Sequence, residues 1–107
     1  MALVFVDGRN VQRSQWPNLA DEELVERSRN WAERNGHELV LVFDGNAPAG
    51  AVGTGRESAD DWLIREVPKR PGAWLVTSDR ALRDAAGANA ERIIGGGGFL
   101  KELLRHR

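Results

Sequence analysis

Five aspartates stand where short apolar runs end or where a helix is expected to begin. Asp7 ends ALVFVD, Asp44 ends ELVLVFD and Asp79 follows AWLVTS, while Asp60 and Asp61 open the helical stretch in ESADDWLIREV. In a parallel sheet the carboxyl ends of the strands face one edge, which is where such folds bind ligands. Carboxylates gathered there repel one another unless a cation lies among them, and hard divalent cations prefer oxygen ligands. The pattern therefore predicts a Mg²⁺ or Mn²⁺ site.

Phosphodiester hydrolysis is the chemistry that such a carboxylate set suits best. One or two bound ions activate water and stabilise the in-line transition state, so that no protein nucleophile is required. The chain has no cysteine and no Ser–His pairing of recognisable spacing. Asn10, three residues after Asp7, is placed to orient a neighbouring carboxylate by a hydrogen bond.

Each aspartate also has a local explanation. Asp-Gly pairs, as at positions 7–8 and 44–45, are common in turns. Asp60 and Asp61 follow Ser58 in a first helical turn, where the helix dipole favours negative charge, and Asp79 has the same explanation. Capping alone does not explain why all the strands but the last are followed by an acid at the same edge. The joint occurrence favours a site.

Basic and hydroxyl side chains flank the acids. Arg9, Arg56 and Arg80 each lie beside a proposed acid and are candidates for contacting substrate phosphates, as is Ser78. Pairing with the same acids or plain solvation is an equally good explanation for the arginines.

Three further features have two readings. The amides of Gly95–Gly98 could take a phosphate at a helix N-terminus, although such a run is more often a hinge or a close-packing turn. Trp16 lies in a polar loop near the proposed edge and could stack on a base, whereas Trp31, Trp62 and Trp74 fit core positions. Residues 50–57 have the glycine spacing of a P-loop but lack its Lys and Ser/Thr, so that motif is rejected.

The elements that must position these residues alternate between strand and helix. Strands are expected at 2–7, 38–43, 73–77 and 91–94. Helices are expected from a cap at Asp21 to Gly36, from a cap at Ser58 to Val67, from Ser78 or Asp79 to Ala85, and over Phe99 to Arg105. Residues 8–20 and 45–57 are expected to be loops. The alternation predicts an α/β fold, a three-layer α/β/α domain with a parallel sheet of order 2-1-3-4, which gathers three of the acids at the switch point.

Composition bounds the class of protein. The 107 residues make one domain, 41% hydrophobic and 29% charged, as in an ordinary globular protein. No apolar run approaches the roughly 20 residues of a membrane span, and ALVFV is too short for a signal peptide, so we expect a cytoplasmic protein. The net charge of −1 does not announce a nucleic-acid binder. If the acids hold a metal, however, the remaining surface is basic, and a nucleic acid is still a possible partner.

With these motifs in hand, the whole chain resembles the NYN group of PIN-like nucleases, especially the compact bacterial YacP-like branch. The resemblance rests on VDGRNV at 6–11, VFDG at 42–45, ESADDWLIREV at 57–67 and VTSDRAL at 76–82, in the correct order and spacing. The final GGGGFLKELL falls where that branch has its closing helix. The chain is shorter than that branch, since the segments after the second strand are trimmed.

The resemblance implies a metal-dependent ribonuclease on a PIN-like fold. By position, Asp7, Asp44, Asp60 and Asp79 correspond to the acidic metal site and Asn10 to its polar helper, with the adjacent Asp61 as a secondary ligand. We therefore expect an endonuclease acting on single-stranded RNA. A homodimer and a ribosomal or RNA-processing partner remain open.

Two alternatives belong to other classes. One is a catalytically inactive RNA- or protein-binding module that keeps the fold. The other is a phosphatase-like hydrolase of small phosphate esters, which is disfavoured because position 9 is Arg, so that no Asp-x-Asp pair follows the first strand.

Overall fold

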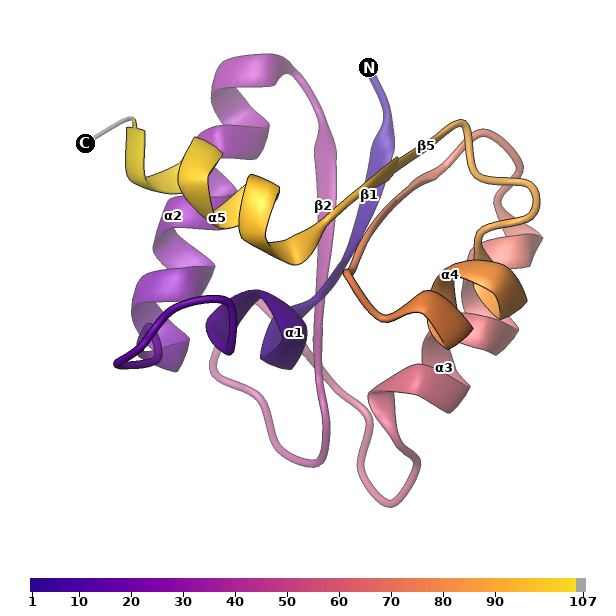
Figure 1. Cartoon of the computed structure of the whole chain (residues 1–107), viewed down its shortest axis with the longest axis horizontal. Coiled ribbons are helices and arrows are strands. Elements are labelled where there is room, and N and C mark those ends of the chain that lie inside the picture. The colour runs from indigo at the N-terminus through magenta and orange to yellow at the C-terminus, as the bar shows by residue number, and fades with distance from the viewer. Residues whose placement is uncertain (106–107) are drawn as a thin grey trace.

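The computed structural model describes residues 1–105, which fold around a five-stranded parallel sheet (Figure 1). The strands are β1 (Leu3–Asp7), β2 (Glu38–Phe43), β3 (Val52–Gly53), β4 (Trp74–Val76) and β5 (Arg92–Ile94). The helices are α1 (Gly8–Gln12), α2 (Asp21–Asn35), α3 (Ala59–Glu66) with the short 3-10 helix η1 (Val67–Lys69), α4 (Arg80–Ala86) and α5 (Gly96–Arg105). Among these helices none is both long and apolar enough to cross a bilayer.

The sheet confirms the predicted topology. Its order is β3-β2-β1-β4-β5, so the four predicted strands lie in the predicted order with β1 at the centre. β1 pairs over its whole length with β2, from Leu3 opposite Glu38 to Asp7 opposite Val42, and through Val4–Val6 with β4. All strand pairs are parallel, so the carboxyl ends of the strands lie at one edge.

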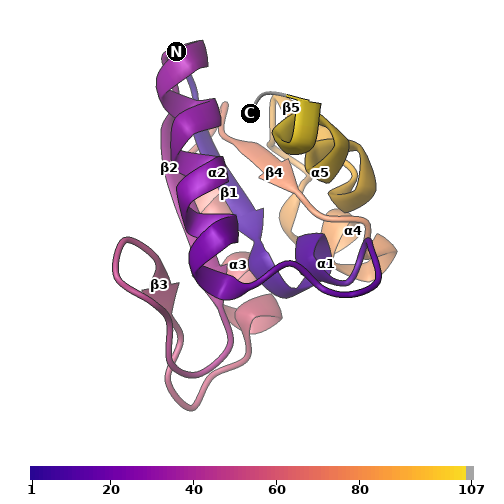
Figure 2. The ribbon, with the colours of Figure 1, turned by 90° about the vertical axis from the view of Figure 1, so that its left-hand side faces the viewer.

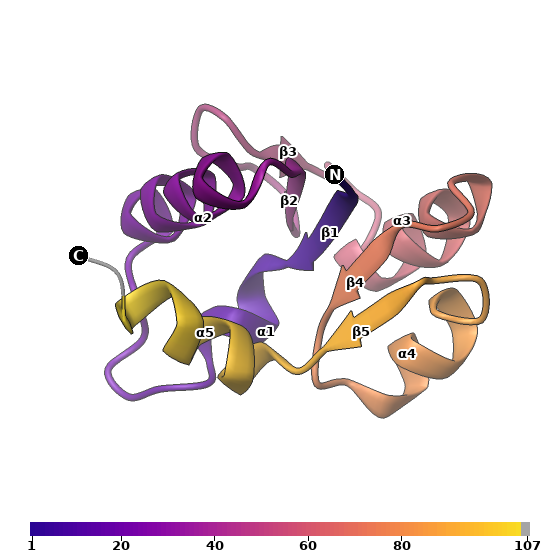
Figure 3. The same cartoon turned by 90° about the horizontal axis from the view of Figure 1, so that it is seen from above.

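Helices cover both faces of the sheet, which makes the predicted three layers (Figure 3). Val4 and Val6 of β1 pack with α1, α2 and α5, whereas Phe5 points to the opposite face and packs with α3 and α4. This alternation follows from the two-residue period of a strand, and it explains why β1 is a continuous apolar run. The core therefore has two halves with β1 between them.

Two segments expected to be loops contain structure. Residues 8–12 form α1, which follows β1 directly, with Val11 and Gln12 buried and Gly8 so close to β2 that a Cβ would lie 2.9 Å from the Val42 carbonyl oxygen. Val52–Gly53, inside the glycine-rich 45–57 segment, pair with β2 as an outer edge strand (Figure 2). Both elements are too short for a periodic pattern.

The helix starts are partly as predicted. Ser58 caps α3, since its Oγ accepts from the Asp61 amide at 3.0 Å, and Asp79 caps α4 by accepting from the Leu82 amide at 3.0 Å. The prediction that Asp21 caps the first long helix is wrong, because Ala20 holds that position. The last helix begins at Gly96 rather than Phe99, so most of the glycine run forms its first turn.

The tryptophans divide as predicted. Trp31 is buried in the core, and Trp62 and Trp74 are half-buried against it. Trp16, in the segment between α1 and α2, is 90% exposed.

Candidate active site at the carboxyl edge of the sheet

Four of the five predicted aspartates line one cavity of about 170 Å³ at the carboxyl edge of the sheet. Asp7 ends β1, Asp44 follows β2, Asp60 lies in the first turn of α3 and Asp79 caps α4. The other lining residues come from α1 and the start of α3 and are Arg9, Asn10, Arg13, Ser58 and Ala59. We call this cavity the aspartate pocket. Four elements that are distant in sequence therefore deliver carboxylates to one place.

Larger cavities do not compete with the aspartate pocket as a catalytic site. Cavities of about 820 Å³ and 380 Å³ lie along α2 and α5, and neither contains a predicted site residue. The larger is lined mainly by α2 side chains, and the smaller by aromatic rings that pack on one another. Size alone does not mark a site, whereas converging titratable groups do.

Asp7 forms the floor of the aspartate pocket and is only 5% exposed. Its Oδ2 accepts a hydrogen bond of 3.0 Å from the Thr77 hydroxyl. The pKa of Asp7 is raised to about 6, mainly by burial and also by the charges of Asp60 and Asp44, against the lowering effects of Thr77 and the Asn10 backbone amide. Asp7 is thus a carboxylate held where negative charge is unfavourable.

The pKa of Asp60 is also affected by burial and by the neighbouring carboxylates. Its pKa is raised first by burial and then by the charges of Asp79, Asp44 and Asp61. The carboxylates therefore act on one another electrostatically, which is the arrangement that a bound cation relieves.

Asp44 and Asp79 each accept a hydrogen bond from a backbone amide and also line the aspartate pocket. Asp79 Oδ1 caps α4, so the local explanation of Asp79 is correct. Asp44 Oδ1 accepts from the Ala59 amide at 2.5 Å, a contact across the chain with the start of α3 rather than within its own turn. A carboxylate has two oxygens, and each of these hydrogen bonds uses one of them. Neither hydrogen bond removes the residue from the pocket.

The donor types suit magnesium or manganese, although the side chains do not form a closed cage. Within residues 1–105, no three carboxylate, imidazole or thiol side chains are close enough to hold one ion together. Mg²⁺ is commonly bound through one or two carboxylates with the remaining positions filled by water, so hard oxygen donors in this pocket fit that mode. Direct binding by all five aspartates at once does not fit.

Asn10 is tied to the far side of the pocket. Its Oδ1 accepts from the Ser78 amide at 2.8 Å, and Ser78 Oγ accepts from the Gly96 amide at 2.7 Å. Asn10 thus contacts Asp7 through its backbone amide and uses its side chain to hold the turn before Asp79. A Cβ at Gly96 would overlap Asn10 Oδ1, which explains a glycine where α5 meets this turn. Ser78 lies outside the pocket lining and joins these elements.

The predicted arginines have separate places. Arg9 lines the pocket, but its Nη1 donates to Asp21 Oδ1 at 2.8 Å and to Gln12 Oε1 at 2.7 Å, which commits it to the start of α2. Arg56 and Arg80 are exposed and outside the pocket lining.

Arg13 also lines the pocket and was not among the predicted site residues. It lies four residues after Arg9, so predicting α1 as a helix would have placed both on one face. Thr77, the partner of Asp7, was missed as well. Its position at the carboxyl end of the strand next to β1 was the available signal.

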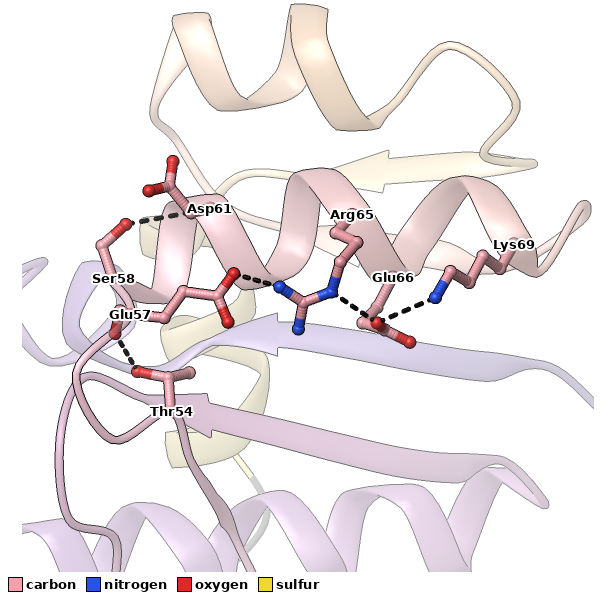
Figure 4. Close-up of polar contacts among 7 residues, drawn as sticks. All are labelled: Thr54, Glu57, Ser58, Asp61, Arg65, Glu66 and Lys69. Atoms are coloured by element: carbon pink, nitrogen blue, oxygen red, sulfur yellow. Dashed lines mark hydrogen bonds and ion pairs between the residues drawn. The ribbon is translucent and has the colours of Figure 1, made fainter.

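Asp61 is the predicted ligand that the pocket lining leaves out. It is exposed on α3, where its backbone amide is capped by Ser58 (Figure 4). A chain of ion pairs runs beside this helix and joins Glu57, which precedes α3, to Arg65 and Glu66 of α3 and to Lys69 of η1 (Figure 4). Such exposed pairs contribute little to stability, so the outer face of α3 is a solvated surface.

Comparisons with known proteins support the fold. No protein-family model and no curated protein sequence matches the chain. A mutant form of Rae1 (YacP) from Bacillus subtilis superposes with a TM-score of 0.78 at 20% identity, covering 98% of this chain and 76% of that one. Another structure of Rae1 (YacP) gives a TM-score of 0.69 at 17% identity, covering 98% and 75%. The chain thus has a YacP-like fold, as the motifs implied.

Proposed function

We propose that this protein is a metal-dependent ribonuclease that cleaves RNA endonucleolytically, using Mg²⁺ or Mn²⁺ held by the aspartate pocket. One observation carries the proposal, namely that Asp7, Asp44, Asp60 and Asp79 reach one cavity from four separate elements. The YacP-like fold agrees with the resemblance of the four motifs to NYN and PIN-like nucleases, and that resemblance implies this chemistry.

Each pocket residue has a role in the proposal. One or two of Asp7, Asp44, Asp60 and Asp79 would hold the ion directly and the others through bound water, since within residues 1–105 no three potential ligands are close enough to hold one ion. The ion, when bound, would supply an activated water and stabilise the charge of the transition state. Asn10 keeps the Asp79 turn against β1 through Ser78. Arg13 is exposed at the pocket wall and would contact a substrate phosphate, whereas Arg9 positions α1 against α2.

A catalytically inactive RNA- or protein-binding module is the second candidate. The observation in its favour is that no three potential ligands among residues 1–105 converge on one ion. This candidate predicts RNA binding that is unaffected by metal and by charge removal in the pocket.

Cleavage of a circular RNA tests the proposal, because a circle has no ends and only an endonuclease opens it. The purified chain is assayed with Mg²⁺, Mn²⁺ or EDTA, beside Asp7→Asn, Asp60→Asn and the control Asp84→Asn on the exposed face of α4. We expect metal-dependent opening by the unmodified protein and by Asp84→Asn, and a loss of at least about 100-fold in both pocket variants. Unchanged cleavage by both pocket variants, or none by any protein with either metal, would contradict it.

A further inference from the structure

Trp16 is the most exposed aromatic side chain in residues 1–105, and the packing of the protein does not explain it. It is 90% exposed, whereas the other three tryptophans are buried or half-buried. Single exposed apolar residues are common and mean little alone, so its setting has to carry the argument.

The segment that displays Trp16 is anchored on both sides. On one side Ser14 Oγ donates to the Asn10 carbonyl at 2.9 Å, and its amide donates to the Val11 carbonyl at 3.1 Å. On the other side Leu19 is buried in the core, and the buried Gln12 donates to its carbonyl at 3.0 Å. The backbone around Trp16 is therefore held before any ligand arrives.

Two further bonds extend this anchoring. Gln12 Nε2 also donates to Asp21 Oδ1 at 2.5 Å, which ties α1 to the start of α2 beneath the segment. With its amide turned to satisfy both partners, Asn18 donates to the carbonyls of Gln15 and Gln12 at 3.1 Å and 3.3 Å. An aromatic ring displayed on a pre-ordered backbone binds at a lower entropic cost than one on a loose segment.

The aspartate pocket lies close to this platform. Arg13, three residues before Trp16, lines the pocket, and three residues of extended chain span at most about 11 Å. The order along the chain is thus acid, cation and exposed indole, all within residues 7–16. A cation beside an aromatic face is the combination that holds a nucleic-acid backbone and an adjacent base.

We infer that Trp16 is a base-stacking platform that binds an unpaired nucleotide next to the phosphate held at the aspartate pocket. The inference rests on the proposed function. Every base has a π face, so the platform is tolerant of sequence. In a duplex those faces are covered by neighbouring base pairs, and the indole finds no partner there. A protein contact at Trp16 is the competing use of the same side chain.

Binding measured without cleavage tests this inference separately from the nuclease proposal. Full-length protein in EDTA is titrated into a labelled single-stranded RNA and into the same sequence as a duplex. Trp16→Ala should weaken single-strand binding about 10-fold, within the range for loss of one stacked base, while Trp16→Phe should retain most of it. Duplex binding should not change. Ile64→Ala, at another exposed apolar residue on α3, is the matched control and should bind like the unmodified protein.

Tryptophan fluorescence gives a second readout, because the Trp16 indole is 90% exposed whereas the other three are buried or half-buried. Single-stranded RNA should quench the emission of the unmodified protein but not that of Trp16→Phe. Equal single-strand affinity of Trp16→Ala and the unmodified protein, with no quenching, would overturn the inference and favour a protein contact.

Cleavage data separate the two proposals. Under metal, Trp16→Ala should raise KM with kcat nearly unchanged. If the Asp7 substitution abolishes cleavage and the Trp16 substitution leaves KM and kcat unchanged, the base-stacking role of Trp16 is overturned and the nuclease proposal stands. Binding that requires Trp16 without any cleavage would support the platform and overturn the nuclease.

Discussion

Thr77 donates a hydrogen bond of 3.0 Å to Asp7, and these two residues close the carboxyl ends of adjacent strands. The bond is the main contact that keeps the Asp7 carboxylate ionisable in a buried position, because it opposes the rise in pKa that burial causes. Even so the pKa stays near 6, against 3.8 for an unperturbed aspartate.

Asp7→Asn should therefore stabilise the metal-free fold at neutral pH. The folded state of the unmodified protein binds a proton more tightly than the unfolded state, so its stability falls as pH rises from about 4 to about 6. At about 1.4 kcal/mol per pH unit, the full effect is up to about 3 kcal/mol at pH 7. Urea unfolding in EDTA at pH 4 and pH 7 measures it. Asp84→Asn is the control, and a gain for Asp7→Asn that is equal at both pH values would refute the explanation.

A bound metal ion should offset the loss of stability that the ionised Asp7 carboxylate causes in the unmodified protein at neutral pH. An ion bound only by the folded state at ten times its Kd adds about 1.4 kcal/mol, which raises Tm by several degrees for a domain of this size. Thermal melts with Mn²⁺ should show the rise in the unmodified protein and in Asp84→Asn, and a smaller one in Asp60→Asn. An identical Tm with and without Mn²⁺ at millimolar concentration, together with no heat in calorimetry, would exclude a metal site in the free protein.

Asp79 allows the capping role to be separated from the charge. Asp79→Asn keeps an oxygen for the Leu82 amide, because Asn caps helices about as well as Asp, so its stability should stay within about 0.5 kcal/mol. Asp79→Ala loses the cap and should cost about 1 kcal/mol. Both should lose RNA cleavage. Activity that survives in Asp79→Asn and falls only in Asp79→Ala would show that the residue serves as a cap alone.

Asp61 is the residue for which the structure and the resemblance to NYN nucleases give different expectations. It lies next to Asp60 in sequence but outside the pocket lining, so Asp61→Asn should keep at least about half of the cleavage rate, whereas Asp60→Asn should not. Single-turnover rates on the same RNA compare the two variants directly. A loss in Asp61→Asn as deep as that in Asp60→Asn would assign it a role at the ion.

Four of the five strands and their order could be predicted because β1, β2, β4 and β5 are apolar runs, the first three of them followed by an acid, and because doubly wound sheets have a switch point. Those same rules placed Asp7, Asp44, Asp60 and Asp79 at one edge, and the structure brings all four to one pocket. The order of the elements and the residue that follows each strand can be identified from neighbouring residues in the sequence.

The features that could not be predicted depend on contacts between residues that are not neighbours in the sequence. Gln12 is buried because Leu19 and Asp21 accept its amide, so α1 owes its burial to residues that follow it. Arg9 also donates to Asp21, which is 12 residues farther along the chain. α5 begins within its glycines because Gly96 has to fit against Asn10, 86 positions earlier. No periodicity in the sequence records such pairings.

The central position of β1 also sets an order of events during synthesis. β1 is made before its partners, yet one neighbour starts at Glu38 and the other at Trp74, and the Asp79 turn follows the second. During translation β1 must therefore wait until Val76 has been made before both of its edges are paired. The aspartate pocket forms only after Asp79 has followed, so Asp7 is made long before the site to which it belongs.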